Sequence, residues 1–366
     1  MNKSELECRL ALTQIDGLGP VKIRKLISLA GNAQVLFNPG PELFLKAGKG
    51  LQEALTSISA QSGKAHLWAK KKVALLQKSD FTTVSFDEPG YPIQLGRCHD
   101  APPLLFIKGN LALTHSRTVA IVGTRKATQY GIDFTRELVD YLSRYGVVII
   151  SGLAHGIDAI AHQRALENGI PTWAVLGHGF DRIYPSRNRS LANQMLEKGG
   201  WITEFVPGLK PERENFPKRN RIIAGLCDVC IVIEAARKGG ALITAELANS
   251  YGRDVMALPG RCSDTYSQGC NSLIRTHKAH LIERPFNVVE LLNWEKKGVP
   301  KQAKIHFDLT ADETSLLSFF PPPQQRISIN ELSIAAEMTV PETLALLLQL
   351  ELKSAIRSFG GGYFSR

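Results

Sequence analysis

The sequence of 366 residues lacks the features that would place it in a membrane or in an oxidising compartment. No apolar run reaches the roughly 20 residues that a helix needs to cross a bilayer. The first residues, MNKSELECRL, include acidic side chains where a secretory signal peptide has its apolar core. The six cysteines are scattered rather than grouped as a disulfide framework. We therefore expect a cytoplasmic protein with reduced cysteines.

Signatures of common nucleotide-binding and hydrolytic sites are also missing. Gly123 is followed by Gly131 without an intervening G-x-G, so the dinucleotide fingerprint is absent. No G-x-x-x-x-G-K-[ST] stretch occurs, which removes the ATP-binding P-loop. Ser151 lacks the G-x-S-x-G context of a hydrolase nucleophile. These absences argue against a cofactor-dependent enzyme and against a serine hydrolase.

Two short arrangements are reminiscent of metal sites. Cys227 and Cys230 form a C-x-x-C pair, and His155, Asp158 and His162 lie close together in HGIDAIAH. A structural metal site needs about four ligands, and neither arrangement has a second cluster of ligands nearby. Residues three apart on a strand point to opposite faces, so the two cysteines fit burial better than metal binding. We expect neither a metal nor a cofactor.

Positive charge is what the chain has in excess. Its net charge is +10, which favours polyanionic partners. Residues 1–80 carry a net +6, whereas residues 301–366 carry −1. Within the basic segment, Gly17-Leu18-Gly19-Pro20 separates two helical patterns as in a helix-hairpin-helix, whose turn amides can hold a phosphate, and Gly48-Lys49-Gly50-Leu51 is a weaker copy. Both DNA contact and a plain helical bundle fit this segment.

From Thr118 the sequence alternates between short apolar runs and helical patterns. The expected strands are VAIVG, VVIIS, TWAVLG, WITEF, VCIVIEA and DVMALPG, with helical stretches such as GIDFTRELVDYLSRYG between them. This alternation predicts an α/β fold with a doubly wound parallel sheet, whose ligands bind beyond the carboxyl ends of the strands. Before it, residues 81–110 are rich in proline and end in LLFIKGN, which we interpret as a linker and an edge strand.

Glycines and cations follow these strands and form the predicted binding site. We expect contacts with a polyanion from Gly123, Thr124, Arg125, Ser151, Gly152, Phe216, Lys218, Arg219, Asn220, Arg221, Gly239 and Gly240. Amides at helix starts and guanidinium groups suit phosphates, and Lys218 to Arg221 are expected as a cationic loop where a helix begins. Tyr130, Tyr184 and Phe216 are candidates for stacking on bases. The alternative for each aromatic residue is packing in the core, which we favour for Tyr130.

The pattern changes again past Pro300. Residues 296–309 are expected to form a linker, and residues 310–366 a winged helix built from ISINELSIAAEM, VPETLALLLQLELK and the glycine-rich hairpin IRSFGGGYFSR. The second of these stretches would be the recognition helix. It carries acids and leucines where a DNA reader needs arginine, so we expect packing or protein contact from it rather than groove reading.

In this order, the loops resemble those of the DNA-processing protein A family, also called Smf. The resemblance covers about Pro102 to Ile282 and includes VAIVGTRKATQYG, ISGLAHGIDAIAHQRAL, AVLGHGFDRIYPSRN, TEFVPG, FPKRNRIIAGL, ALITAELANSYGRDVMALPG and SQGCNSLIR. It implies a noncatalytic protein of bacterial transformation and recombination that binds single-stranded DNA, forms a homodimer through its Rossmann domain and loads RecA on the strand. The Gly-Ser/Thr-Arg motif of the family falls on Gly123 to Arg125, and its Phe-Pro-x-Arg-Asn-Arg motif on Phe216 to Arg221.

With the resemblance, the expected organisation is a helical domain over residues 1–80, an extended Rossmann DNA-binding domain over 81–295, a linker over 296–309 and a winged helix over 310–366. Two alternative functions use the same sheet. One is a nucleotide-processing phosphoribohydrolase, whose Pro-Gly-Gly-x-Gly-Thr-x-x-Glu loop is partly matched by Gly239 to Glu246, with Lys238 in place of the proline and Leu242 in place of the third glycine. The other is a nucleotide sensor.

Overall fold

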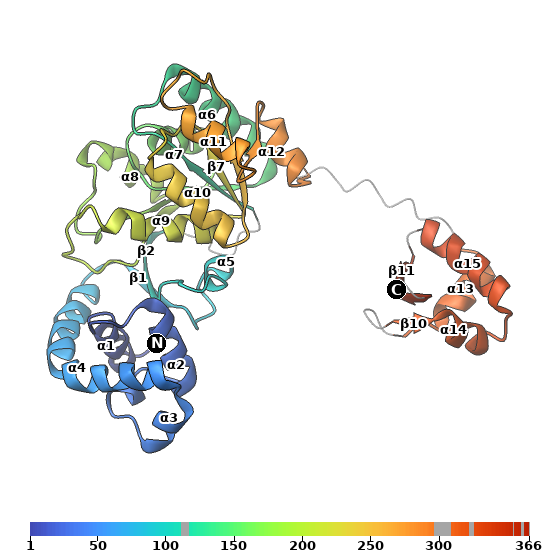
Figure 1. Cartoon of the computed structure of the whole chain (residues 1–366), viewed down its shortest axis with the longest axis horizontal. Helices are drawn as coiled ribbons and strands as arrows, with labels where there is room; N and C mark the ends of the chain where they lie inside the picture. Colours follow the sequence, from blue (N-terminus) through green and yellow to red (C-terminus); the bar gives the residue numbers. More distant parts are fainter. Residues whose placement is uncertain (111–116, 296–308, 322–325, 354, 360–361, 366) are drawn as a thin grey trace. The chain divides into compact units, whose positions relative to one another are not determined.

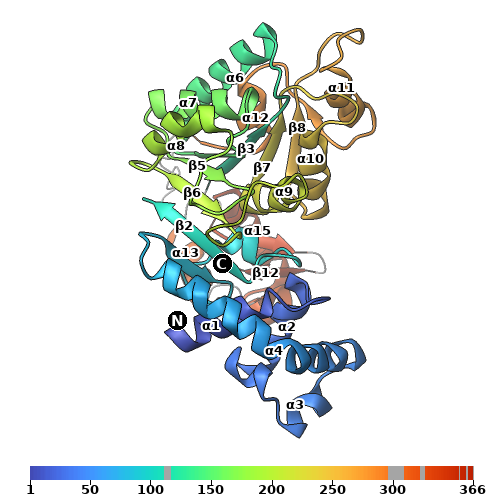
Figure 2. The same cartoon turned by 90° about the vertical axis from the view of Figure 1, so that its left-hand side faces the viewer.

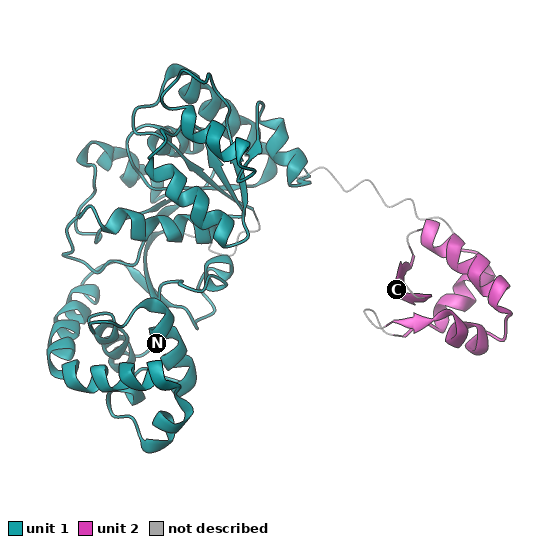
Figure 3. Ribbon diagram, in the orientation of Figure 1, with its two compact units in different colours: residues 1–297 teal, residues 298–366 magenta. Residues whose placement is uncertain are grey.

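A computed structural model describes the chain except for residues 111–116, 296–308, 322–325, 354, 360–361 and 366. The chain forms two compact units, residues 1–297 and residues 298–366 (Figure 3). The linker predicted at 296–309 lies outside the described residues except for its last one. The first unit contains both the N-terminal helices and the large sheet, so the boundary predicted between residues 80 and 81 does not separate two compact units and stays a prediction.

A nine-stranded sheet forms the centre of the first unit (Figures 1 and 2). Its strands are β1 (Thr82–Ser85), β2 (Leu104–Gly109), β3 (Thr118–Val122), β4 (Val148–Ser151), β5 (Thr172–Val175), β6 (Gly200–Thr203), β7 (Val229–Val232), β8 (Asp254–Ala257) and β9 (His280–Leu281). The spatial order is β1-β2-β6-β5-β4-β3-β7-β8-β9. Along this spatial order, every pair of neighbouring strands from β6 through β5, β4, β3, β7 and β8 to β9 is parallel. The predicted α/β fold, with its six strands after residue 117, is confirmed.

The region before residue 118 differs from the expectation. LLFIKG was predicted as the edge strand, but β2 pairs on both sides, with β1 and with β6, and both pairings are antiparallel. That prediction is wrong because the short polar strand TTVS of β1, which carries almost no apolar signal, covers the outer side of β2. The buried run of β2 is thereby protected from water along both of its edges.

Helices cover both faces of the sheet because alternate strand residues point in opposite directions. In β3, Val119 and Ile121 pack with α6 (Gln129–Leu142), α7 (Ile157–Glu167) and α12 (Phe286–Leu291). Ala120 and Val122 face the opposite layer, whose helices are α5 (Ile93–Gly96), α9 (Asn215–Leu226), α10 (Gly240–Ser250) and α11 (Gln268–Arg275). The helix α8 (Arg189–Met195) packs near β5 and β6. Two-sided coverage explains the continuous apolar character of the central strands.

The N-terminal helices share a hydrophobic core with the sheet. They are α1 (Lys3–Leu12), α2 (Pro20–Ala30), α3 (Pro41–Lys46) and α4 (Lys49–Leu76), with a 3₁₀ turn at Gln34–Phe37. Their buried leucines and isoleucines form one cluster with Leu104 and Phe106 of β2 and Trp201 of β6. The predicted turn between the first two helices is present, with Gly17 at φ +76° and Gly19 capping α2.

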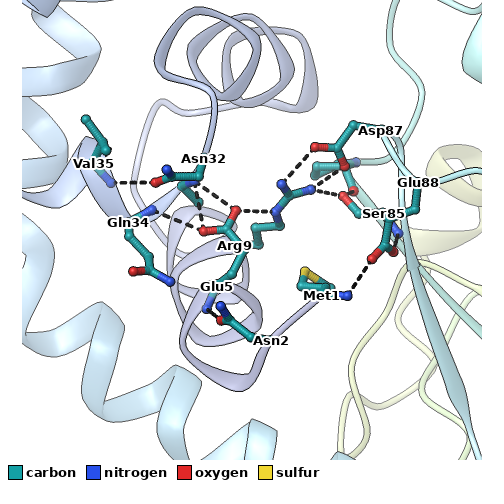
Figure 4. Close-up of polar contacts among 12 residues, drawn as sticks. Met1, Asn2, Glu5, Arg9, Asn32, Gln34, Val35, Ser85, Asp87 and Glu88 are labelled. Carbon is teal, nitrogen blue, oxygen red and sulfur yellow. Dashed lines mark hydrogen bonds and ion pairs between the residues drawn. The ribbon is translucent and has the colours of Figure 1, made fainter.

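A buried arginine adds a polar connection between these helices and the sheet (Figure 4). Arg9 of α1 is 5% exposed, and its guanidinium contacts Glu5 at 2.6 Å and the two carboxylate oxygens of Asp87 at 2.5 and 2.8 Å. It also donates to the hydroxyl of Ser85, at the end of β1. Glu5 in turn accepts the backbone amide of Ala33 at 2.8 Å. The fully paired charge holds α1 against the edge of the sheet.

The second unit is small and has its own apolar cluster, centred on Leu332, Leu347 and Leu350. Its elements are α13 (Ala311–Ser318), β10 (Ile327–Ser328), α14 (Ile329–Ala335), α15 (Val340–Leu352), β11 (Arg357–Phe359) and β12 (Tyr363–Ser365). The three strands form a sheet in the order β10-β12-β11. Assignment of this unit as a winged helix stays a prediction, and two of the glycines of the predicted wing, at 360 and 361, lie outside the described residues.

Candidate nucleic-acid interface

The loops that follow β3 and β7 meet at the centre of the sheet. The central strand β3 pairs with β4 on one side and with β7 on the other. The strands from β4 to β6 then follow one another toward one edge of the sheet, and those from β7 to β9 toward the other edge. Ligands of open α/β sheets bind at such a switch point, beyond the carboxyl ends of the strands. A cavity of about 350 Å³ lies there. Its lining includes eight of the twelve predicted site residues, namely Gly123, Thr124, Arg125, Phe216, Arg219, Asn220, Gly239 and Gly240.

The loop after β3 approaches the start of α7 closely. A Cβ atom at Gly123 would come within 2.6 Å of the side chain of Ile157, so a larger residue would push this loop off α7. The carbonyl of Thr124 accepts the amide of Ile157 at 3.2 Å. This packing fixes the backbone and leaves Arg125 exposed at the cavity, with its guanidinium carbon 5.9 Å from the centre of the Phe216 ring. Among the described residues that line the cavity, Arg125 is the one exposed cation.

The start of α10 forms the opposite wall of the cavity. Gly239 is the N-cap residue, and Gly240 has open space where a Cβ atom would lie. Amides in the first turn of a helix have no acceptor within the helix and can bind an anion. The side chain of Asn220 donates to the carbonyl of Gly240 at 3.3 Å and so links α9 to this wall. A phosphate can approach the backbone here without meeting side chains.

The residues predicted as a cationic loop, Lys218 to Arg221, instead belong to α9, which begins at Asn215. The expectation of a loop is wrong because the helix starts three residues before the first of these cations. A helix turns by about 100° per residue, so these four side chains point to different sides. Phe216, at the start of the same helix, and Asn220 share the face that lines the cavity.

Arg219 points inward rather than into solvent. It is 5% exposed, and its guanidinium donates to the carbonyls of Gly152 at 2.6 Å and Val175 at 2.5 Å, at the ends of β4 and β5. Burial lowers the pKa of Arg219 to about 10, and the nearby carboxylate of Asp158 opposes that shift. Arg219 therefore ties α9 to the strand ends and contributes a partly shielded positive charge beneath the cavity.

Lys218 and Arg221 lie on the other side of α9. They line a second cavity of about 580 Å³ between the N-terminal helices and the sheet, whose wall is largely apolar. Arg221 is paired with the carboxylate of Glu204 and donates to the carbonyl of Asp100. The structure thus separates these two cations from Arg125 and Arg219 instead of gathering all four around one site.

The remaining predicted residues support the backbone. Ser151 is buried and its hydroxyl donates to the carbonyl of Ile121 at 2.6 Å, so it does not line the 350 Å³ cavity. The amide of Gly152 donates to Asp158 at 3.1 Å. Asp158 is itself buried, and burial raises its pKa, although Arg219 and these amides act in the opposite direction. These contacts fix the loop that precedes α7, and the interpretation of Asp158 as a residue that stabilises the helix start stays a prediction.

An acidic residue that the sequence analysis overlooked lies at the cavity. Glu234 follows β7, is buried, and accepts hydrogen bonds from the backbone amide and the hydroxyl of Thr128 at 2.9 and 2.5 Å. It thereby fixes the start of α6. The sequence does contain a signal for this role, namely a carboxylate directly after an apolar strand. A carboxylate at that position can cap a helix that begins at the same edge of the sheet.

Aromatic rings extend the site past Arg125. Tyr184 is 45% exposed, and its ring centre lies 5.7 Å from that of Phe216. Both rings adjoin a small pocket that also contains Arg125 and His155. Exposed aromatic faces beside a cation are the groups that bind unpaired bases. Tyr130 is also half exposed, with its hydroxyl donating to the carbonyl of Pro259, so the expectation of core packing for this residue is wrong.

The two arrangements that the sequence suggested as metal sites do not form a ligand cluster in the described part of the chain. Within the described ranges, no three His, Cys, Asp or Glu side chains lie close enough to hold a metal ion. His162 is buried and contacts the hydroxyl of Thr172 at 2.7 Å. Cys227 and Cys230 are both buried, and burial raises their pKa values. No helix in the described part of the chain has the length and apolarity to cross a bilayer.

Fold and cavity together define a Rossmann-like α/β protein whose switch point presents amides, one exposed cation and aromatic rings. Comparison with known proteins identifies the family. Residues 82–293 match the family model of DNA recombination-mediator protein A. Protein Smf of Escherichia coli is 37% identical over 295 residues, which cover 79% of this chain and 78% of that protein. The chain therefore belongs to the DNA recombination-mediator protein A family.

Related structures agree with this assignment. DNA processing protein A from Streptococcus pneumoniae superposes with a TM-score of 0.63 at 34% identity, covering 81% of this chain and 98% of that one. The protein from Helicobacter pylori has a TM-score of 0.54 at 29% identity, covering 59% and 98% of the two chains. The Helicobacter pylori protein binds single-stranded DNA.

Proposed function

We propose that this protein binds single-stranded DNA at the 350 Å³ cavity and acts as a noncatalytic recombination mediator. The observation that carries the proposal is the combination at one switch point of exposed Arg125, the open helix start at Gly239 and Gly240, and the neighbouring rings of Phe216 and Tyr184. A phosphate would bind the cation and the amides, while an unpaired base would stack on the rings. Membership of the family and the DNA-binding mode described for the Helicobacter pylori relative support this proposal.

Two further properties belong to the same proposal. The resemblance to the family implies a homodimer through the sheet domain and the loading of RecA recombinase onto the bound strand in the cytoplasm. Hand-over of the strand requires an accessible ligand, and the cavity is open to solvent beyond the carboxyl ends of the central strands. Nucleation of RecA filaments on single-stranded DNA, with and without this protein, tests the second property directly.

A phosphoribohydrolase reaction finds less support in the geometry. Glu246, the carboxylate that would act in such an enzyme, is exposed and lies 3.6 Å from Lys278. It does not line the cavity that contains Gly239 and Gly240. Release of free base from nucleoside monophosphates, abolished by Glu246→Gln, would favour the enzyme over the binding protein.

Fluorescence anisotropy with single- and double-stranded oligonucleotides across a salt series tests the proposal. We expect preference for single strands and weaker binding by Arg125→Ala, with a log–log salt slope shallower by roughly 0.7 if one phosphate contact is lost. Arg144→Ala is the matched control, since Arg144 is also exposed and lies 6.0 Å from an aromatic ring, that of Tyr141, but follows the far end of α6. Equal effects of the two substitutions would show that binding reflects overall charge and not this cavity.

A further inference from the structure

An apolar face of α15 in the second unit is not covered by the described residues of that unit. Val340, Leu344, Leu348 and Leu352 recur every four residues and are 42%, 44%, 53% and 81% exposed. At about 100° per residue they follow one flank of the helix, and Pro341 and Ala345, which are also exposed, extend the same flank. The opposite flank, with Thr343, Leu347 and Leu350, is buried in the core of the unit.

The apolar flank contains no ionised side chain that is free to meet a charged ligand. The charged residues of α15 are Glu342 and Glu351. The carboxylate of Glu342 accepts the amide and hydroxyl of Thr339 at 2.9 and 2.6 Å, and that of Glu351 accepts the amide and hydroxyl of Ser358. Both acids therefore cap or brace their own unit.

This composition selects the kind of partner. Nucleic acid is bound through lysine and arginine, and α15 has neither. Helices that lie on membranes carry the same cations on their polar face, which excludes a lipid surface by the same argument. A face made of leucine, valine, alanine and proline is matched by another apolar protein surface.

The positions of the apolar residues along this flank are also symmetric about the centre of α15. If two copies of α15 pack antiparallel through their apolar flanks, about a two-fold axis at the level of residue 346 along the helix, Val340 of one copy meets Leu352 of the other. Leu344 then meets Leu348 in the same way. A contact in which the same patch is used by both partners is the ordinary form of a homodimer interface. An unrelated partner would not require this match between the two halves of the helix.

We propose that α15 is a self-association surface that pairs with α15 of a second copy of this chain. The exposed flank amounts to about three fully exposed aliphatic residues, or roughly 500 Å² of apolar surface, at the upper end for a monomeric protein. Pairing two flanks buries about 1,000 Å² in total, the lower limit for a specific interface. The contact is therefore reversible and depends on protein concentration, and it is distinct from a dimer formed through the sheet domain.

Sedimentation velocity of the full chain over a wide concentration range tests the proposal. At high concentration the wild-type protein is expected to reach at least twice the mass of a Leu344→Gln, Leu348→Gln variant, because two different pairing surfaces on each subunit can join dimers end to end. Leu45→Gln, Leu67→Gln is the matched control, because these two leucines are also exposed but lie on α3 and α4. A dimer through the sheet domain is retained by all three proteins and does not contribute to the difference. Equal masses for the wild type and the α15 variant at every concentration overturn the proposal.

Cross-linking tests the antiparallel geometry in the same chain. The background is Cys262→Ser, since Cys262 is the exposed cysteine of the six. Pairing about Leu346 places residue 348 about 6 Å along the axis from its own copy and residue 340 about 18 Å from its own copy, at 1.5 Å per residue. A short bismaleimide should therefore link Leu348→Cys chains and not Val340→Cys chains. The reverse result, or linkage of neither, contradicts the proposed pairing.

Discussion

Replacing Arg219 with methionine is expected to lower the free energy of unfolding of the first unit by about 3–5 kcal/mol. The side chain is 5% exposed, and one guanidinium nitrogen serves the carbonyls of both Gly152 and Val175. Methionine fills a similar volume but leaves both carbonyls without their donor. A hydrogen bond that involves a charged group contributes about 1.5–3 kcal/mol, so two such bonds account for the range. Buried Asp158 also loses the positive charge that favours its ionised form.

Tryptophan fluorescence during urea unfolding measures this effect in the first unit alone. All the tryptophans of the chain belong to that unit, namely Trp68, Trp173, Trp201 and Trp294. Arg125→Met is the matched control, because Arg125 is exposed and its contact with the Phe216 ring contributes at most about 1 kcal/mol. We expect Arg219→Met to lower the free energy of unfolding much more than Arg125→Met does. Under conditions in which both variants are folded, we expect Arg125→Met to weaken DNA binding more than Arg219→Met does.

A loss below about 1 kcal/mol for Arg219→Met would refute the reasoning. It would mean that water reaches the two carbonyls and replaces the guanidinium, so that Arg219 is available to a ligand. In that event the substitution should weaken DNA binding as much as Arg125→Met does, and the distinction between a structural and a binding arginine would disappear.

Two further predictions concern buried titratable groups. Burial lowers the pKa of His162 from 6.5 to about 3, so between these values the unfolded chain binds a proton that the folded chain does not. The free energy of unfolding should therefore fall by up to about 1.4 kcal/mol per pH unit as the pH decreases through this range. His162→Gln should make this pH dependence shallower in urea titrations at several pH values. The same pH dependence in the wild type and in the variant would contradict the assignment. Titration of the folded protein with a thiol reagent should give one fast cysteine, Cys262, and five more after unfolding, whereas fast reaction of Cys227 or Cys230 would contradict their burial.

The sheet was predictable because its signal is local and repeated. The runs VAIV and VCIVI are apolar at every position, which indicates coverage on both faces, and the glycine loops after them mark the carboxyl edge. The observed strands start and end within a few residues of these runs. The strand TTVS could not be found in this way, because an edge strand with one solvated face needs little apolar character. Its pairing with LLFIKG depends on contacts distant in sequence.

The composition of the site was predictable, but the direction of its side chains was not. Reading Lys218 to Arg221 as a loop put four side chains at one place, whereas the helix separates them. The information was present in the spacing: Lys218 and Arg221 are three apart and share a face, and Phe216 and Asn220 are four apart and share another. Only the structure shows at which residue α9 begins. Pro217, in the first turn, is compatible with a helix start two residues earlier.

The inward position of Arg219 changes what kind of binding the cavity supports. A site lined by four free cations would depend strongly on salt, since each phosphate contact contributes roughly 0.7 to the log–log slope for a single strand. Arg125 is the exposed cation among the described lining residues, so under the proposed function most of the affinity should come from stacking on the rings and from the amides of the helix start. Binding by one copy should therefore be only moderately sensitive to salt. A strand long enough to span several copies would gain affinity by linking such modest sites together, which would be compatible with the proposed hand-over of the strand.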